Sequence, residues 1–503
     1  MRRRVLVVGW DGATWDVLDR LMERGLMPNL ERLRSEGVWG TLTSTYPPIT
    51  GPSWFSMATG MNPGKTGVYD FLTRTTSDYL LHPISSSFIR GKAYWDILSR
   101  RGINVGVFAY PMTYPPYPVN GFMVTDPGPR LRAAYVSYPG NLADRIENAT
   151  GGYEPFVNYH LKKYDDTRLF IEDVNRHLEK ILKVLMYLVT DQRWDVFTFV
   201  LSCTDWIQHR MWKHFDETYP LYDPGPNGAY QRAFEDLWTK IDMSLGDITA
   251  AAGPDTQLIL VSDHGFGPQM GRFDIVRWLE MKGYLTLTKV ERMKNILLDW
   301  MPRRHVGALL GDRLRAKLRR YLPQDSLTDP KTGRAYRIDF AKSKAFLLGH
   351  TIPWGFIYLN RKGRDSNGFL GEKEAEGIAS DLVSQLKNLS RDIGREIRVD
   401  IFRSSEVFWG KSVQWAPDIL FMLDGGECVV TKRYDVDLFR NEPYSTRHTG
   451  SHRLEGIFVA HGPGIRGHNR VEISINDVAP TILGLVGQHP TAHMDGTPLN
   501  VIS

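Results

Sequence analysis

The stretch QLILVSDHG, residues 257–265, joins a strongly apolar run to an aspartate, a histidine and a glycine. The apolar residues Leu258 to Val261 predict a strand buried on both faces, as in parallel sheets. Adjacent strand residues point to opposite faces, so Asp263 and His264 can share a ligand only where the strand breaks into a loop. A carboxylate and an imidazole beside such an apolar run indicate a paired or metal-binding site at the strand end.

Similar apolar runs recur along the chain, and helical patterns separate them. The runs are VLVVGWD (5–11), INVGVFAYP (103–111), VFTFVLSCTD (196–205), DILFML (418–423) and GIFVAHGP (456–463). The helical patterns cover residues 14–36, 53–59, 91–101, 168–190, 229–251 and 477–486. Buried strands that alternate with helices predict an α/β fold whose mostly parallel sheet is covered on both faces. In such sheets, sites form beyond the carboxyl ends of the strands.

One region interrupts this alternation, and it divides the chain. We expect a catalytic α/β core over residues 1–285 and 411–503, with an inserted cap over residues 286–410. Residues 289–323 of the cap read as helical and basic, with an apolar stripe, and residues 361–374 as a polar loop. A lid helix that packs its apolar stripe on the core is favoured over a helix that contacts a membrane surface.

The composition excludes several classes of protein. The 503 residues are 42% hydrophobic and 24% charged, as in ordinary globular proteins. A net charge of +5 is too mild over this length to indicate sequence-specific nucleic acid binding, but it suits an anionic substrate. The two cysteines, Cys203 and Cys428, form no disulfide framework, and no run approaches a membrane span or a signal peptide, so we expect a cytoplasmic protein.

Aspartates and histidines gather at the expected strand ends. The candidates are Asp11, Asp205, His209, Asp263, His264 and His452. Taken singly, Asp11 could cap a helix, and Asp205 with His209 could form an ion pair at helical spacing. Taken together, they are more ligands than one tetrahedral zinc ion accepts, so two metals are predicted, with zinc preferred and manganese or iron as alternatives. Two metals suit phosphoryl transfer.

The loop TYPPITGPSW, residues 45–54, offers three hydroxyl groups on a sharply shaped backbone. Two other motifs can be rejected. GMNPGKT (60–66) is one residue too short for a phosphate-binding P-loop, and GPSWF (51–55) lacks the second glycine of a serine-hydrolase elbow.

The motifs, in their order, resemble the alkaline phosphatase superfamily, and within it the type I phosphodiesterase/nucleotide pyrophosphatase family. They are VGWDG (8–12), TYPPITGPSWFSMATGMNPGKTG (45–67), TDWIQH (204–209), SDHGFG (262–267), HTGSHRLEGIFVAHGPGI (448–465), and NDVAPTILGLVG (476–487) with DGTPL (495–499). The resemblance implies an alkaline-phosphatase-like three-layer α/β/α sandwich with an inserted cap.

The resemblance also assigns roles. It implies one metal held by Asp205, His209 and His452, and a second held by Asp11, Asp263, His264 and Thr50. It makes Thr50 the nucleophile, which would form a phospho-enzyme that water then hydrolyses. A helix that begins near Pro52 would point free N–H groups at the phosphate.

The sequence departs from the family pattern around the substrate phosphate. Ser53 and Phe71, beside Asp70, stand where nucleotide pyrophosphatases often carry asparagines, and Lys65 and Thr66 replace a Ser-His pair. Ser53, Lys65, Asp70 and Phe71, together with His448, are therefore the candidate substrate contacts.

The leading hypothesis is a two-metal hydrolase of phosphodiester or nucleotide pyrophosphate bonds. Its substrate would be a small-molecule phosphodiester, a nucleotide, or a lipid or glycan phosphate, and peripheral membrane contact stays open. Within the fold, the alternatives are a metal-dependent phosphomutase of the phosphoglycerate mutase type or a phosphomonoesterase. A protein that binds metal or a membrane surface through its basic insertion is the non-enzymatic alternative.

Overall fold

A computed structural model describes residues 4–125, 135–288, 338–349, 353–432, 437–443, 448–465 and 470–500, and the backbone of 327–328 and 335–336. The predicted basic helical segment, residues 289–323, lies outside the described residues.

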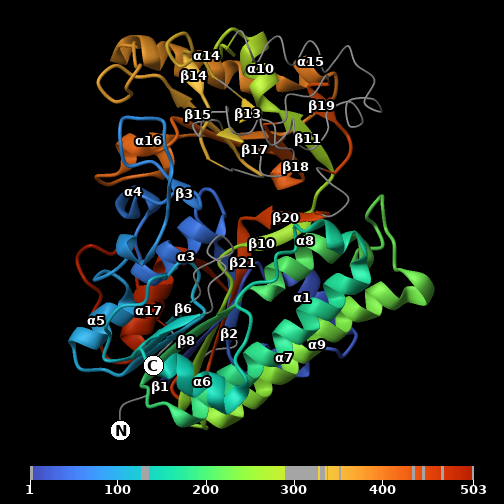
Figure 1. Ribbon diagram of the computed structural model, residues 1–503, viewed down its shortest axis with the longest axis vertical. Coiled ribbons are helices and arrows are strands. Elements are labelled where there is room, and N and C mark those ends of the chain that lie inside the picture. The colour runs from blue at the N-terminus through green and yellow to red at the C-terminus, as the bar shows by residue number, and fades with distance from the viewer. Residues whose placement is uncertain are drawn as a thin grey trace, which may run out of the picture.

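A nine-stranded, mostly parallel sheet forms the centre of the larger part of the molecule (Figure 1). Its order is β22-β2-β21-β9-β1-β8-β5-β6-β7. In chain order, these strands are β1 (Arg4–Trp10), β2 (Val38–Thr43), β5 (Val105–Phe108), β6 (Gly121–Thr125), β7 (Val136–Tyr138), β8 (Val196–Leu201), β9 (Thr256–Val261), β21 (Glu455–His461) and β22 (Arg470–Ser474). The central block β9-β1-β8-β5-β6 is parallel throughout. Its strands β9, β1, β8 and β5 were predicted as parallel strands, whereas β6 was not predicted.

The run at 456–463 was expected to be a parallel strand, and that expectation is wrong. It forms β21, which runs antiparallel to both β2 and β9. The reason lies in the preceding strand, β20 (Gly450–Arg453), which pairs with β10 (Gly265–Pro268) just beyond the carboxyl end of β9. The chain therefore enters β21 at the carboxyl end of β9 and runs back along β9 in the opposite direction.

Helices cover both faces of the sheet, because residues along each buried strand alternate between two cores. On β1, Leu6 and Val8 face one core and Val5 and Val7 the other. The first core is covered by α1 (Trp15–Glu23), α2 (Pro28–Glu36), α6 (Leu142–Thr150), α7 (Thr167–Asp191), α8 (Cys203–Phe215) and α9 (Ala229–Ala252). The second is covered by α3 (Thr50–Thr59), α5 (Tyr94–Arg100) and α17 (Val478–Leu485). The result is a three-layer α/β/α sandwich (Figure 1).

The helical pattern at 14–36 is divided into α1 and α2. Gly25 lies between them with a φ of 71°, a left-handed conformation that favours glycine, and Pro28 opens α2.

A second sheet forms the smaller part, at the top of Figure 1. Its order is β14-β15-β17-β18-β11-β19, with β16 paired to β17. The strands are β11 (Gly271–Asp274), β14 (Ala345–Phe346), β15 (Gly355–Leu359), β16 (Val399–Arg403), β17 (Ile419–Leu423), β18 (Cys428–Thr431) and β19 (Phe439–Arg440). Three helices share its apolar core, namely α10 (Ile275–Met281), α14 (Glu372–Lys387) and α15 (Leu389–Ile393).

The second sheet draws strands from both sides of the predicted cap boundaries, 286–410. Strand β11 precedes them, and β17, β18 and β19 follow them. The run at 418–423 was expected to be a parallel strand of the main sheet, and this is wrong. It forms β17, which pairs antiparallel with β15, β16 and β18. A strand that is buried on both faces is apolar in either sheet. The hydrophobic pattern of residues 418–423 therefore could not show which sheet this strand joins.

The remaining elements are short. They are α4 (Pro63–Thr66), α16 (Ser404–Val407), and the strand pairs β3 (Leu72–Thr73) with β4 (His82–Pro83) and β12 (Leu327–Thr328) with β13 (Ala335–Tyr336).

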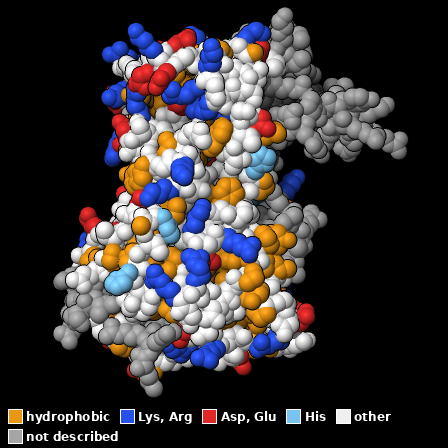
Figure 2. All heavy atoms as spheres, turned by 90° about the vertical axis from the view of Figure 1, so that its left-hand side faces the viewer, with side chains coloured by type: hydrophobic (Ala, Val, Ile, Leu, Met, Phe, Trp, Pro, Cys, Tyr) orange, Lys and Arg blue, Asp and Glu red, His pale blue; other side chains and the backbone are white. Residues whose placement is uncertain are grey.

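The surface view shows a mixed distribution of charge. On the face in Figure 2, Lys and Arg side chains are scattered among acidic and apolar ones over both parts of the molecule. Among the described residues, no helix is long and apolar enough to cross a membrane.

Candidate metal centre

The carboxyl ends of three neighbouring parallel strands bring the predicted ligands together. Asp11 directly follows β1, and Asp263 and His264 follow β9. Asp205 and His209 lie on α8, which begins two residues after β8. Because β9, β1 and β8 are adjacent and in register, their ends meet at one edge of the sheet.

One cluster surrounds the Nε2 atom of His264. This atom lies 3.5 Å from Asp11 Oδ1, 3.3 Å from Asp263 Oδ2 and 3.4 Å from the hydroxyl of Thr50. Asp11, Asp263 and His264 are almost completely buried, whereas Thr50 is half-buried. Of these four residues, only Thr50 is partly exposed to solvent.

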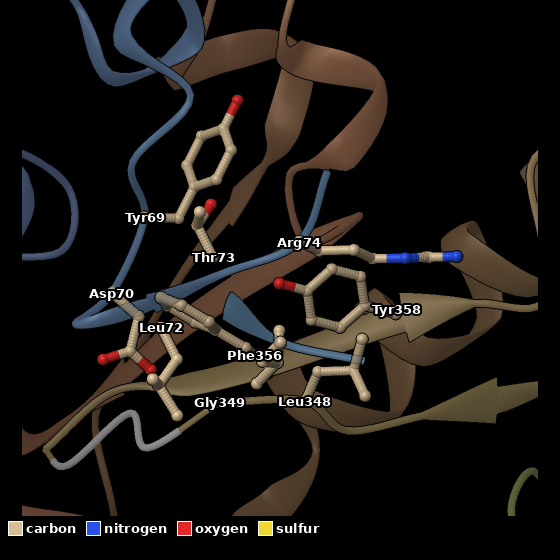
Figure 3. A pocket seen from close by; sticks show the side chains of 10 residues that line it. Tyr69, Asp70, Leu72, Thr73, Arg74, Leu348, Gly349, Phe356 and Tyr358 are labelled. Atoms are coloured by element: carbon tan, nitrogen blue, oxygen red, sulfur yellow. The ribbon is translucent and has the colours of Figure 1, made fainter. Parts of the chain in front are cut away.

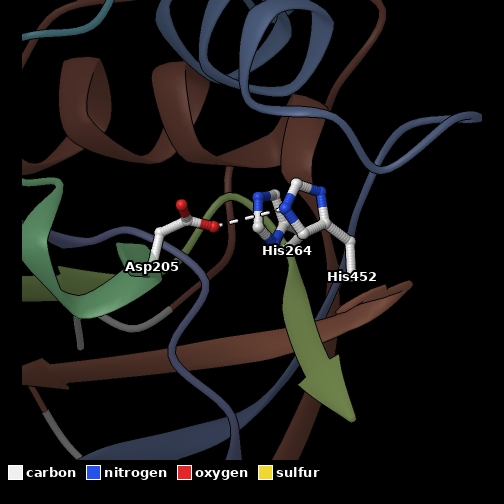
Figure 4. Close-up of side chains that lie close together, drawn as sticks. All are labelled: Asp205, His264 and His452. Atoms are coloured by element: carbon white, nitrogen blue, oxygen red, sulfur yellow. Dashed lines mark ion pairs between the residues drawn. The ribbon is translucent and has the colours of Figure 1, made fainter. Parts of the chain in front are cut away.

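The second cluster surrounds Asp205 Oδ1. This oxygen lies 3.3 Å from His209 Nε2 and 3.2 Å from His452 Nε2, and the two nitrogens are 3.1 Å apart. The rings of His264 and His452 stack at 3.7 Å between centroids, so the two clusters are contiguous (Figure 4).

The three imidazoles are held in one tautomer. In each ring, Nδ1 lies within hydrogen-bond distance of a backbone carbonyl: Gly265 for His264 (3.1 Å), Gly450 for His209 (3.0 Å) and Pro48 for His452 (2.9 Å). A carbonyl can only accept, so Nδ1 carries the proton and Nε2 presents a lone pair. Two facing Nε2 lone pairs have no proton to share, and a cation between the side chains would satisfy both.

The carboxylates of the two clusters present oxygens that lack hydrogen-bond donors. Asp11, Asp205 and Asp263 each have one buried oxygen that accepts no hydrogen bond from the described residues, and these are the oxygens that face the Nε2 atoms. The other oxygen of Asp11 accepts from Trp54 Nε1 (3.2 Å), and that of Asp263 from Gly12 N (3.2 Å). Buried oxygens without donors are costly unless a cation neutralises them. Ligand atoms close enough to hold an ion occur in two groups that share His264, namely Asp11–Asp263–His264 and Asp205–His264–His452, and His209 lies beside the second. Carboxylates mixed with imidazoles fit divalent ions of the zinc, manganese or iron type.

The pKa shifts of the clustered side chains also favour a bound cation. Burial, together with the neighbouring carboxylates, raises the pKa of Asp11 far above its usual value, and burial raises the pKa of Asp263 to about 8. Burial also opposes ionisation of Asp205, but positive charge beside it outweighs burial and lowers the pKa of this carboxyl. Without a metal, protonated His209 and His452 supply that charge, and a bound cation would take their place. Burial lowers the pKa of His264 strongly, so this imidazole is neutral. Without a cation, the first cluster would hold protons that metal binding releases.

Thr50 occupies the first position of α3, with Ile49 as the N-cap residue. The first N–H groups of a helix have no intrahelical partner, so those of Thr50 and Gly51 are available to an anion beside the Thr50 hydroxyl.

The structure does not bring Ser53 or Lys65 into either cluster. The hydroxyl of Ser53 is fully buried against the hydroxyls of Ser44 (3.0 Å) and Thr45 (2.9 Å). The ammonium of Lys65 pairs with Asp495 at 2.5 Å. The hydroxyl of Ser53 thus bonds to the loop that precedes α3, and the ammonium of Lys65 bonds to the C-terminal segment.

The other three candidate substrate contacts, Asp70, Phe71 and His448, lie in different surroundings. Asp70 lies in a small pocket between segment 69–74 and β15, opposite Gly349 (Figure 3), and its Oδ1 accepts from the backbone N–H of Phe71 at 2.6 Å. Phe71 is 44% exposed. His448 lies closest to the clusters, with its ring centroid 5.4 Å from that of His209.

Sequence reasoning missed three residues near the site. Trp54 binds Asp11, Tyr159 stacks on His209 with 5.7 Å between centroids, and His160 Nδ1 lies 3.0 Å from His448 Nε2. Tyr159 and His160 belong to an irregular segment without a motif, so only the fold could place them.

The fold and the site define a metal-dependent phosphoric ester hydrolase. The chain belongs to the type I phosphodiesterase/nucleotide pyrophosphatase family, whose model matches residues 5–362. The family membership confirms the resemblance seen in the motifs, and it makes the protein an enzyme of the phosphodiesterase and nucleotide pyrophosphatase class.

Several solved structures are similar at low identity. Murine ectonucleotide pyrophosphatase/phosphodiesterase 5 aligns over 100% of both chains, with 14% identity and a TM-score of 0.49. An inactive variant of the murine protein in complex with AMP (14%) and the human protein (15%) each align over 98% of this chain and 97% of theirs, also at 0.49. Curated protein sequences give no significant match.

Proposed function

We propose that the protein hydrolyses a phosphodiester or nucleotide pyrophosphate bond with two divalent metals and a phospho-threonine intermediate at Thr50. The observation that carries the proposal is the convergence of three donor-free carboxylate oxygens and three Nε2 lone pairs beside the Thr50 hydroxyl.

The proposed ligand sets follow the two clusters. Asp11, Asp263 and His264 would hold one ion next to Thr50, and Asp205, His209 and His452 would hold the other. When bound, the ions would supply positive charge that lowers the pKa of the threonine hydroxyl and stabilises the phosphoryl oxygens.

The proposed reaction has two steps, transfer of the phosphoryl group to Thr50 and hydrolysis of the phospho-threonine. Thr50 Oγ1 forms a bond to phosphorus, and the bond from phosphorus to the leaving oxygen breaks. The N–H groups that open α3 orient the phosphoryl oxygens during this transfer. Water next cleaves the phosphorus–Oγ1 bond, which releases the phosphoryl product and restores the threonine.

The family membership supports a small-molecule nucleotide or other phosphodiester as substrate. Thr50 is the partly exposed residue of its cluster, so a bulky leaving group can project away from the buried carboxylates.

The test replaces Thr50 and measures chemistry and metal separately. Thr50→Ala should lower turnover of an aryl phosphodiester by at least about 10³-fold, because the nucleophile is lost. Metal content should stay near two ions per chain, since the buried ligands are unchanged. The matched control is Thr59→Ala at the other end of α3, where the hydroxyl donates to the backbone carbonyl of Phe55 (2.7 Å) and accepts from the backbone N–H of Met61 (3.3 Å).

A Thr50→Ala enzyme that retained turnover would exclude the phospho-threonine route. Parallel assays with phosphomonoesters and with a phosphomutase substrate separate the diesterase from its alternatives within the fold.

A further inference from the structure

A second cavity lies outside the metal centre, between α7 and the irregular segment 154–164 that precedes it. Its volume is about 510 Å³, within the range of small-molecule sites. We propose that it binds a small organic anion that carries an apolar body.

The wall contributed by segment 154–164 supplies the apolar surface. Phe156, Val157 and Leu161 line this side of the cavity. Leu161 is 45% exposed, so its side chain is accessible to a ligand in the cavity. The side chains would cover the apolar body of a ligand.

Cations outnumber acids among the charged residues that line the cavity, and two of the cations, Arg176 and Lys180, lie on α7. Lys163, Arg176 and Lys180 line the cavity with the acids Glu154 and Asp173. Asp173 is already committed, because it pairs with Lys163 at 2.6 Å, accepts from Tyr164 OH at 2.8 Å and also pairs with Arg176. Lys180 lies within 4.0 Å of no carboxylate of the described residues, so its ammonium is available to an anion.

The cavity also contains a polar group held in a fixed orientation. His177 is 3% exposed, and its Nδ1 lies 2.7 Å from the carbonyl oxygen of Glu154. This bond joins the two walls and fixes their separation. The cavity therefore combines an apolar surface from segment 154–164 with a net positive charge, to which Arg176 and Lys180 of α7 contribute.

The position of the cavity bears on the metal centre. Phe156 and His177 both pack against Trp206 of α8, each with 5.0 Å between ring centroids. Trp206 follows Asp205 directly, and segment 154–164 also carries Tyr159, which stacks on His209. A ligand in the cavity would thus contact residues one layer behind the second metal cluster.

The test uses 8-anilinonaphthalene-1-sulfonate, a fluorescent aromatic sulfonate, on the metal-loaded full chain. Lys180→Glu should weaken its binding by about tenfold or more, as loss of one charge-assisted contact predicts. The matched control is Lys183→Glu, which makes the same change in net charge on the same helix at an exposed position outside the cavity. The control should bind the probe within about twofold of the wild type.

Two further measurements examine the apolar wall and the need for charge. Leu161→Ala should weaken probe binding, whereas Leu169→Ala, at a similarly exposed leucine outside the cavity, should not. 4-Phenylbutyrate should displace the probe, and the uncharged 4-phenylbutan-1-ol should not.

Equal probe affinity in Lys180→Glu and Lys183→Glu would overturn the proposal, and so would equal displacement by the alcohol. The measurement involves no catalysis, so its result is independent of the two-metal mechanism.

Discussion

Trp54 links the nucleophile helix to a candidate metal ligand. Its indole N–H donates to Asp11, and its backbone carbonyl accepts from Tyr110 OH at 2.6 Å. The ring lies so close to β1 that a Cβ on Gly9 would stand 2.5 Å from it, which explains a glycine inside an otherwise Val-rich strand. Trp54 thus orients the carboxylate and closes the space beneath it.

We predict that Trp54→Phe weakens metal binding without unfolding the protein. The phenyl ring keeps most of the packing, but Asp11 loses the donor that orients it, so affinity at the site beside Thr50 should fall about 10–100-fold. Chelator competition with Zn²⁺ measures this.

The control for Trp54→Phe is Trp95→Phe. Trp95 lies in the same core, and its indole N–H donates to Tyr117 OH (2.8 Å), away from the metal ligands. Equal metal affinity in both variants would show that the Trp54 hydrogen bond does not orient Asp11.

At the scale of elements, a buried ion pair joins the two parts of the molecule. Arg74, next to β3, pairs at 2.6 Å with Asp365, which follows β15 in the second part, and neither side chain is exposed. We predict that Arg74→Met lowers the free energy of unfolding by about 3 kcal/mol, the low end of the range for breaking a buried pair, because Asp365 keeps its pair with Arg364 (3.1 Å). Urea unfolding measures the loss.

The comparison for Arg74→Met is Arg32→Met, which removes the exposed Arg32–Glu36 pair. That loss should be under about 1 kcal/mol. Similar losses in the two variants would contradict a joining role for Arg74.

The elements also show what the sequence could and could not predict. Four parallel strands of the main sheet, β1, β5, β8 and β9, and most of its flanking helices were predictable, because hydrophobic period and length are local properties. The short strands β6 and β22 and the helix α6 were not predicted. Strand partners are not local, so the pattern assigned β17 to the wrong sheet and β21 to the wrong direction.

The same contrast holds within the site. Asp11, Asp263 and His264 were predictable because polar residues at the end of a buried strand are conspicuous. Ser53 and Lys65 were expected near the phosphate, but Ser44, Thr45 and Asp495 engage their polar groups. Such engagement depends on loops that only the folded chain brings together.

At the scale of the whole molecule, the candidate metal centre ties distant segments into one unit. Its residues run from Asp11 to His452, and β20, which carries His452, pairs with the strand that follows His264. Bound cations would cross-link these segments and neutralise carboxylates that the fold buries. Metal binding should therefore contribute to the stability of the fold as well as to catalysis.

We predict that Zn²⁺ stabilises the metal-free protein by about 2.7 kcal/mol per site at a free concentration of 100 times Kd. Urea unfolding with and without Zn²⁺ measures this increment. In Asp205→Asn, Zn²⁺ should no longer give the part of this stabilisation that comes from the second cluster. In Asp236→Asn, at an exposed position on α9, Zn²⁺ should give the full stabilisation. An Asp205→Asn protein that gained as much stability from Zn²⁺ as the wild type would show that Asp205 holds no cation. The contacts of His209 and His452 with its carboxylate would then have a structural role only.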